Sequence, residues 1–225
     1  MRASKFFYQP SAFHPVIYFK IFHFSNWAAL MKIHFSKISL VAVILFTNTI
    51  ILQAQPTIYL IRHAEKLANW PDDDALDAFH PLSIEGIARA QKLAEQFKPG
   101  SIAAVFSSRT TRALHSALPL AQKLGLPIEV ADACMDTAAI VVFYKNLTQR
   151  FGPDKAVVLV SHSNIIPYLY LLMKAGLYQS CFKESGIKIS SPNEWMLIEG
   201  YDNIWKIDNS PAGKKQCESF SRMKY

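Results

Sequence analysis

The sequence predicts an α/β fold, with helices on both faces of a mainly parallel central sheet. Short β-rich runs alternate with segments of helical periodicity along residues 57–207. Residues 156–160 are apolar without interruption, which is typical of a strand covered on both faces. Because connections between such strands are right-handed crossovers, strands separated by a helix run parallel. We therefore expect three layers, α/β/α.

The expected strands are short and lie at residues 57–61, 101–106, 127–131 and 156–160, followed by a closing hairpin at 195–199 and 203–207. Helices are expected from Ser83 to the Pro99-Gly100 stop, and at about 110–124, 137–151 and 164–175. Ser83 is a candidate N-cap, and Gly125 is placed to end the second helix. Residues 69–81 are polar and acidic, so we expect a loop there.

The composition fits one folded domain and argues against a nucleic-acid partner. The 225 residues are 51% hydrophobic and 18% charged, with a net charge of +7. Five of the 24 basic residues and none of the 17 acidic ones fall in residues 1–54. The rest of the chain then holds 19 basic and 17 acidic residues, a net charge of only +2. A basic surface for nucleic acid is therefore not expected on the folded body.

The first 54 residues predict export. Residues 31–54 read as a signal peptide, in which Met31 and Lys32 precede an apolar run of 15 residues at 38–52. That run is short for a membrane span, so we expect cleavage after Ala54, a periplasmic or secreted protein, and no stable membrane association afterwards. An uncleaved segment would instead anchor the protein in a membrane. We interpret residues 1–30 as a mis-called or disordered extension, 55–209 as the domain, and 210–225 as a flexible basic tail.

The three cysteines do not predict a metal site. Cys134, Cys181 and Cys217 are far apart and lack the spacing of metal ligands. In an oxidising compartment Cys181 and Cys217 could form a disulfide, and free or buried thiols remain the alternative.

Basic side chains follow three of the predicted strands. Arg62 and His63 follow the first strand, Arg109 the second, and His162 the fourth. Because ligands collect beyond the carboxyl ends of parallel strands, these four residues are expected to meet at one edge of the sheet. Two guanidinium groups and two imidazoles suit a dianion such as phosphate. Arg112, on the helix after Arg109, is expected to be structural or solvent-facing.

These residues also stand in motifs. They are Arg62-His63-Ala64-Glu65-Lys66, a Pro81-Leu82-Ser83 helix start, residues 107–113 (SSRTTRA), and Ser161-His162-Ser163. In this order they resemble the histidine phosphatase superfamily, which includes phosphoglycerate mutases and acid phosphatases. The likeness runs from about residue 56 to 207 and is greatest for small, minimal members.

The resemblance implies a phosphoglycerate mutase-like fold and a mechanism without metal or cofactor. His63 would attack phosphorus and become phosphohistidine, and water would then release phosphate. Arg62, Arg109 and His162 would bind the phosphate oxygens. Asn164 would either join this pocket or cap the helix that follows it.

The sequence does not single out the general acid. Glu129, Asp132 and Asp136 lie near the end of the third strand, where the resemblance places such a residue. Asp132 is the choice among them, against a plain surface or capping carboxylate and against a member that works without a dedicated acid.

Three classes of function are compatible with the sequence. The first is a phosphomonoester hydrolase acting on a phosphorylated small molecule or a phosphoprotein. A mutase-like phosphotransferase is its alternative within the family, although residues 132–152 are short for the segment that would close the site. The second is a non-catalytic module that binds phosphate or phosphopeptide. The third is a membrane-anchored structural protein with an idle site.

Overall fold

A six-stranded sheet organises the domain, and five of its strands overlap runs that the sequence predicted as strands. A computed structural model describes residues 55–71, 73–173, 186–190, 195–208 and 220–225, all within the unit Leu52–Tyr225. The order of strands in the sheet is β3-β2-β4-β1-β7-β8. The bounds are β1 Thr57–Arg62, β2 Ala104–Ser107, β3 Ile128–Val130, β4 Ala156–Ser161, β7 Asn203–Ile207 and β8 Phe220–Lys224.

The first four strands run parallel, which confirms a mainly parallel sheet. In β1, Leu60 pairs with Leu159 of β4 on one side and with Trp205 of β7 on the other. The β1–β4, β2–β4 and β2–β3 pairs are parallel, whereas β7 is antiparallel to both β1 and β8. Side chains on both faces of β4 are buried, as its unbroken apolar sequence predicted.

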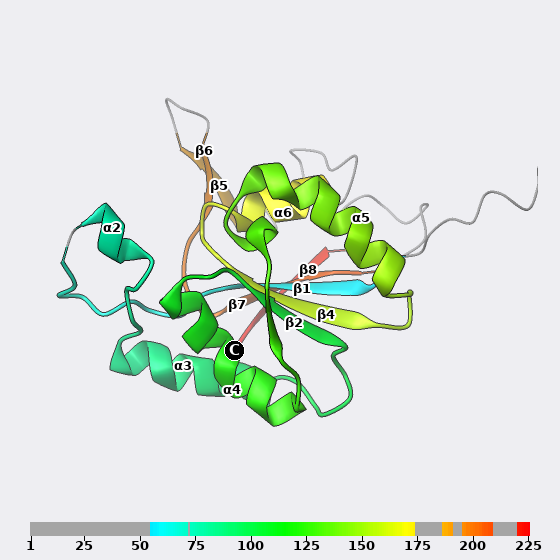
Figure 1. The fold of residues 1–225 in the computed structure, drawn as a ribbon, viewed down its shortest axis with the longest axis horizontal. Helices are drawn as coiled ribbons and strands as arrows, with labels where there is room; N and C mark the ends of the chain where they lie inside the picture. The colour runs from blue at the N-terminus through cyan, green and yellow to red at the C-terminus, as the bar shows by residue number, and fades with distance from the viewer. Residues whose placement is uncertain (1–54, 72, 174–185, 191–194, 209–219) are drawn as a thin grey trace, which may run out of the picture. The chain divides into compact units, whose positions relative to one another are not determined.

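Helices cover both faces of the sheet, so the three-layer prediction is also confirmed (Figure 1). On one face lie α3 (Ile84–Glu95) and α4 (Thr111–Leu124), and on the other lie α5 (Ile140–Arg150) and α6 (Ile166–Met173). Each face has its own core. Leu93 and Leu120 pack with Val158 on the first face, and Ile140 and Leu169 pack with Leu159 on the second.

Local signals set two of the helix ends where the sequence placed them. The Ser83 hydroxyl accepts a hydrogen bond from the Gly86 amide at 3.1 Å and so caps α3. Gly125 ends α4 with a φ of 66°, the left-handed conformation that glycine adopts most easily.

Four elements differ from the sequence-based expectation. The loop at 69–81 contains a short helix, α2 (Asp74–Asp77), capped by Asp73, and the helix expected from residue 137 begins with a 3-10 turn, Thr137–Ala139. The expected hairpin does not form: β6 (Trp195–Ile198) pairs with β5 (Ile187–Ser190), while β7 joins the main sheet. The predicted loose tail contains β8, which pairs antiparallel with β7 on the side away from β1.

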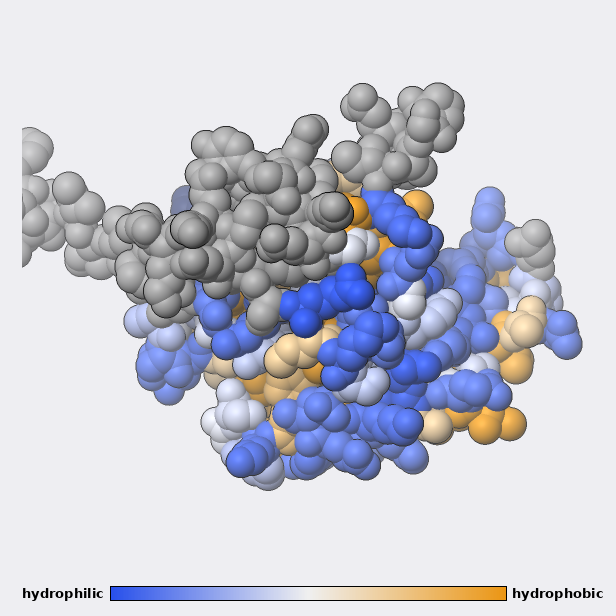
Figure 2. All heavy atoms as spheres, turned by 180° about the vertical axis from the view of Figure 1, so that it is seen from behind, coloured by the Kyte–Doolittle hydropathy of each residue, from blue (hydrophilic) through white to orange (hydrophobic). Residues whose placement is uncertain are grey.

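Several predictions fall outside the described residues. These are the signal peptide, the extension before it, and any pairing of Cys181 with Cys217. Cys134 is a buried free thiol. Among the described helices none has the length and apolar character needed to cross a bilayer. Figure 2 shows the described surface on one side as mostly hydrophilic with separate apolar spots, and Phe79 and Ile84 are among the exposed apolar side chains.

Candidate anion site at the carboxyl edge of the sheet

The candidate site lies where β1, β2 and β4 end. His63 directly follows β1, and its amide donates to the carbonyl of Ser161 at 2.9 Å. Ser108 follows β2 and donates its amide to the carbonyl of Val160 at 3.2 Å, and His162 follows β4. These backbone bonds between adjacent strand ends hold the three segments side by side. The parallel register of the sheet thus brings together side chains about 100 residues apart, as the strand-end rule predicts.

A hydrogen bond from one ring nitrogen fixes the orientation of His63, and the other ring nitrogen takes no part in that bond. Its side chain is buried, and Nδ1 lies 2.7 Å from the carbonyl oxygen of Ala64. A carbonyl oxygen only accepts hydrogen bonds, so the proton of the neutral ring sits on Nδ1. The lone pair is then on Nε2, the atom on the far side of the ring.

His162 lies against His63. The two ring centroids are 5.1 Å apart with an edge-to-face angle of 60°. Nε2 of His162 is 2.8 Å from the buried Ser108 hydroxyl, which in turn lies 3.1 Å from the Thr110 hydroxyl. When Ser108 donates to Nε2, the proton of the neutral ring is on Nδ1 and is available to an anion.

Both imidazoles are neutral at physiological pH. Burial lowers the pKa of His63 to about 3, and electrostatic interactions with His162, Arg112 and Arg62 also lower it, against the opposing effect of the hydrogen bond to the Ala64 carbonyl. Burial likewise lowers the pKa of His162 to about 4, and Arg112 is the charged group that contributes most to this shift. A neutral imidazole beside fixed cations suits a ring that offers a lone pair to an electron-poor centre.

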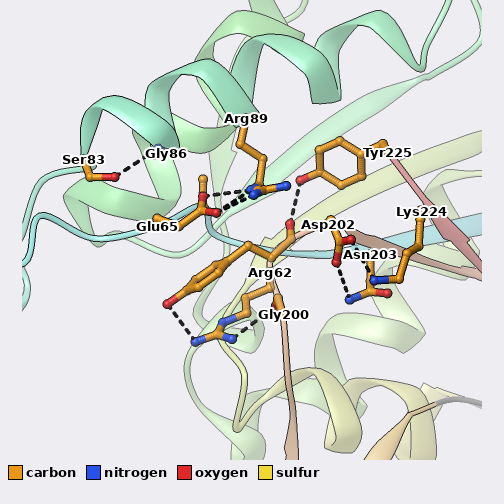
Figure 3. A network of polar contacts seen from close by, with 12 residues as sticks. Arg62, Glu65, Ser83, Gly86, Arg89, Gly200, Asp202, Asn203, Lys224 and Tyr225 are labelled. Atoms are coloured by element: carbon orange, nitrogen blue, oxygen red, sulfur yellow. Dashed lines mark hydrogen bonds and ion pairs between the residues drawn. The ribbon is translucent and has the colours of Figure 1, made fainter.

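Arg62 lies beside His63 and is held by the turn between β6 and β7. Nη1 donates to the carbonyl of Gly200 at 3.1 Å and Nη2 to the Tyr201 hydroxyl at 3.2 Å. Figure 3 shows the guanidinium against this turn, with Glu65 and Arg89 forming a separate pair nearby. The pKa of Arg62 is lowered, chiefly by burial. Its Nε is buried and has no hydrogen-bond partner among the described residues.

Arg112, which the sequence assigned to a structural or solvent-facing role, is the second arginine next to the histidines. It is only 7% exposed, and its charge contributes to the low pKa of both His63 and His162. Nη1 donates to the carbonyl of Asp77 at 2.5 Å and Nη2 to the Asp77 carboxylate at 2.9 Å. Its Nε, like that of Arg62, is buried without a partner among the described residues.

The α4 pattern contained a signal for this placement. The buried residues of α4 recur at helical spacing as Arg112, Ala113, Ser116, Ala117, Leu120 and Ala121. Arg112 is therefore on the inward face of the first turn, whereas Arg109 precedes the N-cap. Ser116 ties this turn to the segment after β1, since its hydroxyl donates to the Arg112 carbonyl and accepts from the Ala64 amide.

The structure does not bring Arg109 to the histidines. Its side chain is 61% exposed and forms an ion pair with Asp132, which is 59% exposed. Asp132 begins a 3-10 turn, Asp132–Cys134, and its carboxylate is directed to Arg109. Neither residue is among the main causes of the low pKa of His63 or His162. Asn164 is exposed in the turn before α6. The geometry thus favours Arg112 over Arg109 and gives Asp132 a partner outside the histidine pair.

The arrangement suits an anion with several oxygens. Two neutral imidazoles converge with the half-buried guanidinium of Arg62 and the buried guanidinium of Arg112, and each guanidinium keeps a buried Nε donor without a partner in the described part of the chain. Leaving such a donor unsatisfied costs about 1–3 kcal/mol, which an oxygen of a bound anion would recover. Across the same described residues no cluster of side chains has the composition of a metal site.

Known proteins carry this fold. The model of the histidine phosphatase superfamily (branch 1) matches residues 58–139, a range that holds Arg62, His63 and Arg112 and ends before His162. No curated protein sequence matches.

Solved structures similar to this chain are distant in sequence. A candidate alpha-ribazole-5'-P phosphatase from Escherichia coli is 16% identical, with a TM-score of 0.50 over 76% of this chain and 95% of its own. SixA from Agrobacterium tumefaciens, a candidate phosphohistidine phosphatase, is 17% identical, with a TM-score of 0.47 over 75% and 96%. A mycobacterial glucosyl-3-phosphoglycerate phosphatase is 18% identical, with a TM-score of 0.43 over 51% and 77%. At these identities the likeness concerns the fold alone.

The mainly parallel sheet and the order of Arg62-His63, the SSRTTRA segment and His162 along the chain agree with this match, and residues 58–139 are thus similar to the histidine phosphatase superfamily.

Proposed function

We propose that this protein is a phosphomonoester hydrolase that works through a phosphohistidine on His63. One observation carries the proposal. The buried, neutral ring of His63 donates through Nδ1 to the Ala64 carbonyl, which leaves the Nε2 lone pair to act as a nucleophile. The match of residues 58–139 to the model of the histidine phosphatase superfamily supports phosphatase activity in general.

In the proposed first step, Nε2 of His63 attacks phosphorus as the bond from phosphorus to the leaving oxygen breaks. The bonding electrons depart with the leaving group, which leaves as an oxyanion and afterwards takes up a proton from water. In the second step water attacks the same phosphorus, the N–P bond breaks, and the electron pair returns to Nε2 as phosphate and a proton are released. Arg62, Arg112 and His162 surround the three equatorial oxygens and stabilise their charge in both steps.

Asp132 is not part of this proposal as a proton donor, because its carboxylate is paired with Arg109. Asp77 is the carboxylate bound to the site arginine Arg112. Although burial raises its pKa, the hydrogen bond and charge of Arg112 lower it overall, so Asp77 is ionised in the free protein and holds no proton to donate. A substrate whose leaving group departs without protonation therefore suits the site, and aryl phosphates are suitable first substrates.

Turnover of p-nitrophenyl phosphate by the purified protein tests the activity. We expect the wild-type chain to release phosphate and His63→Ala to lose at least about a thousandfold in kcat. His115→Ala, an exposed histidine on α4, is the matched control and should keep wild-type turnover. Turnover of His63→Ala at the wild-type rate would contradict the mechanism. A wild-type protein that binds phosphate without turnover would instead be a binding module.

The natural substrate is proposed only as a class, a phosphorylated small molecule or a phosphoprotein. Export is also a proposal, supported by the charged start and apolar run of residues 31–54. Fractionation of the native cells tests it: mature protein that begins near Gln55 should appear outside the cytoplasm, and an unprocessed cytoplasmic chain would contradict export.

A further inference from the structure

Arg62 is bound through both of its terminal nitrogens by residues that belong to none of the recognised motifs. Nη1 donates to Gly200 and Nη2 to the Tyr201 hydroxyl, at 3.1 and 3.2 Å. The Arg62 guanidinium carbon also lies 3.9 Å from the centroid of the Tyr201 ring, a close cation–π contact. Three contacts from one turn therefore fix both the position and the tilt of this guanidinium.

These contacts do not use the Nε of Arg62, so that edge of the guanidinium is available to donate a hydrogen bond to an anion. That Nε is buried and has no partner among the residues that the structure describes. Tyr201 itself lies at the wall of the site, with its ring centroid 6.1 Å from that of His63. A planar guanidinium held by its two Nη atoms on one side presents its donors in a fixed direction on the other.

This turn is held in place by Tyr225, the residue that follows β8. The Tyr225 hydroxyl donates to the carbonyl of Tyr201 at 3.0 Å, and the Tyr225 amide donates to the carbonyl of Asp202 at 3.1 Å. Burial raises the pKa of Tyr225, so its hydroxyl stays a donor. Gly200 has a φ of +77°, which glycine adopts readily and a residue with a side chain rarely does. Figure 3 shows Tyr225 reaching this turn beside Arg62.

We propose that Tyr201 is a positioning residue for the reaction, which holds Arg62 through its hydroxyl and ring so that the Nε edge of the guanidinium faces the reacting phosphate. This inference rests on the proposed function. It concerns phosphate recognition and not the choice of leaving group, because the contacts of Tyr201 are with the phosphate-binding arginine.

The test measures inhibition by inorganic vanadate together with kcat and KM for p-nitrophenyl phosphate in the full chain. Tyr201→Phe removes the hydroxyl and keeps the ring, and we expect the vanadate inhibition constant to rise on the order of tenfold, as for the loss of one hydrogen bond to a charged group. Tyr201→Leu removes the ring as well and should weaken inhibition a further few-fold. Tyr59→Phe, at a tyrosine that packs on Phe97 away from the site, is the matched control.

A double-mutant cycle separates positioning from general stability. In an Arg62→Lys background the planar fork is absent, so Tyr201→Phe should change vanadate inhibition by less than about twofold. Equal effects of Tyr201→Phe in both backgrounds would overturn the proposal, as would unchanged or tighter vanadate inhibition in the single variant. A wild-type chain with neither turnover nor vanadate binding would reject the proposed function instead, so the two failures are distinguishable. Urea unfolding of each variant identifies any loss that comes from folding.

Discussion

The rings of His63 and His162 meet edge to face with their centroids 5.1 Å apart, and both are buried. Each is kept neutral by its surroundings, and each has one nitrogen engaged by a neighbour, Ala64 for His63 and Ser108 for His162. Protonation of either imidazole would place a further positive charge beside Arg62 and Arg112 and would lower the stability of the folded domain. This relationship links the chemistry of the site to the stability of the domain.

The first prediction is a loss of stability between about pH 7 and about pH 5. The pKa values of His63 and His162 are about 3 and about 4 in the folded protein, against 6.5 as the ordinary value for histidine. Between pH 6.5 and 4 the unfolded chain therefore binds protons that the folded chain does not, so the free energy of unfolding falls as the pH falls. Urea unfolding at the two pH values measures the change.

A double variant, His63→Gln with His162→Gln, is the control for this effect. It should lose less stability over the same interval, because its two site residues no longer titrate. The carboxylates with lowered pKa, Asp77, Glu85, Asp154 and Asp202, titrate below this window and do not complicate it. Equal losses in the wild type and the double variant would show that the histidine pair is not the source.

The second prediction separates the two arginines near α4. Arg112→Ala removes a buried guanidinium that acts on both histidines and should lower kcat/KM on the order of a hundredfold or more. Arg109→Ala removes an exposed ion pair with Asp132 and should change kcat/KM by less than about threefold. Steady-state kinetics with p-nitrophenyl phosphate measures both. A larger loss for Arg109→Ala would restore the original sequence-based assignment.

The third prediction concerns the general acid. Asp132 is 59% exposed and paired with Arg109, so Asp132→Asn should leave both kcat and its pH profile nearly unchanged. A general acid typically contributes about a hundredfold or more to the rate. A loss of that size with p-nitrophenyl phosphate, or a larger one with an alkyl phosphate, would show that Asp132 protonates the leaving group despite its position here.

The fourth prediction tests how α3 supports the segment after His63. A Cβ at Gly86 would lie 2.3 Å from the backbone oxygen of Glu65, an atom that cannot yield without moving this segment. Gly86→Ala should therefore destabilise the domain by about 1–3 kcal/mol and reduce turnover. At Gly152 the nearest atom is the flexible Asp154 carboxylate, so Gly152→Ala is a mild control. Urea midpoints that fall equally for the two variants would argue against this close approach.

Local patterns predicted most of the fold, and contacts between distant residues explain the exceptions. The apolar strand at β4, the Ser83 cap and the Gly125 stop depend on neighbouring residues and were recognisable in the sequence. The strand β8 was not, because it is stabilised by pairing with β7, and its own sequence is mostly polar.

In the candidate site, too, some residues were predictable from local sequence patterns and others depend on contacts between distant residues. His63 and His162 follow apolar strands, so their meeting was predictable from the parallel sheet. Arg112 was assigned a structural or solvent-facing role, because its helical spacing from Ser116 on the buried face of α4 does not by itself distinguish a phosphate-binding arginine from a structural one. Tyr201 carries no motif, and its contact with Arg62 spans 139 residues of sequence. Only the folded sheet and its final strand place it there.

Trapping of a labelled phosphoenzyme tests the central claim most directly. Brief exposure to a phosphate-labelled aryl phosphate, followed by alkaline quenching, should leave one acid-labile adduct that maps to His63 and is absent from the His63→Asn variant. Because imidazole N–P bonds hydrolyse in acid and survive in base, the adduct should disappear on acid treatment. An acid-stable adduct, a label on another residue, or labelling of His63→Asn equal to that of the wild type would contradict the proposed mechanism.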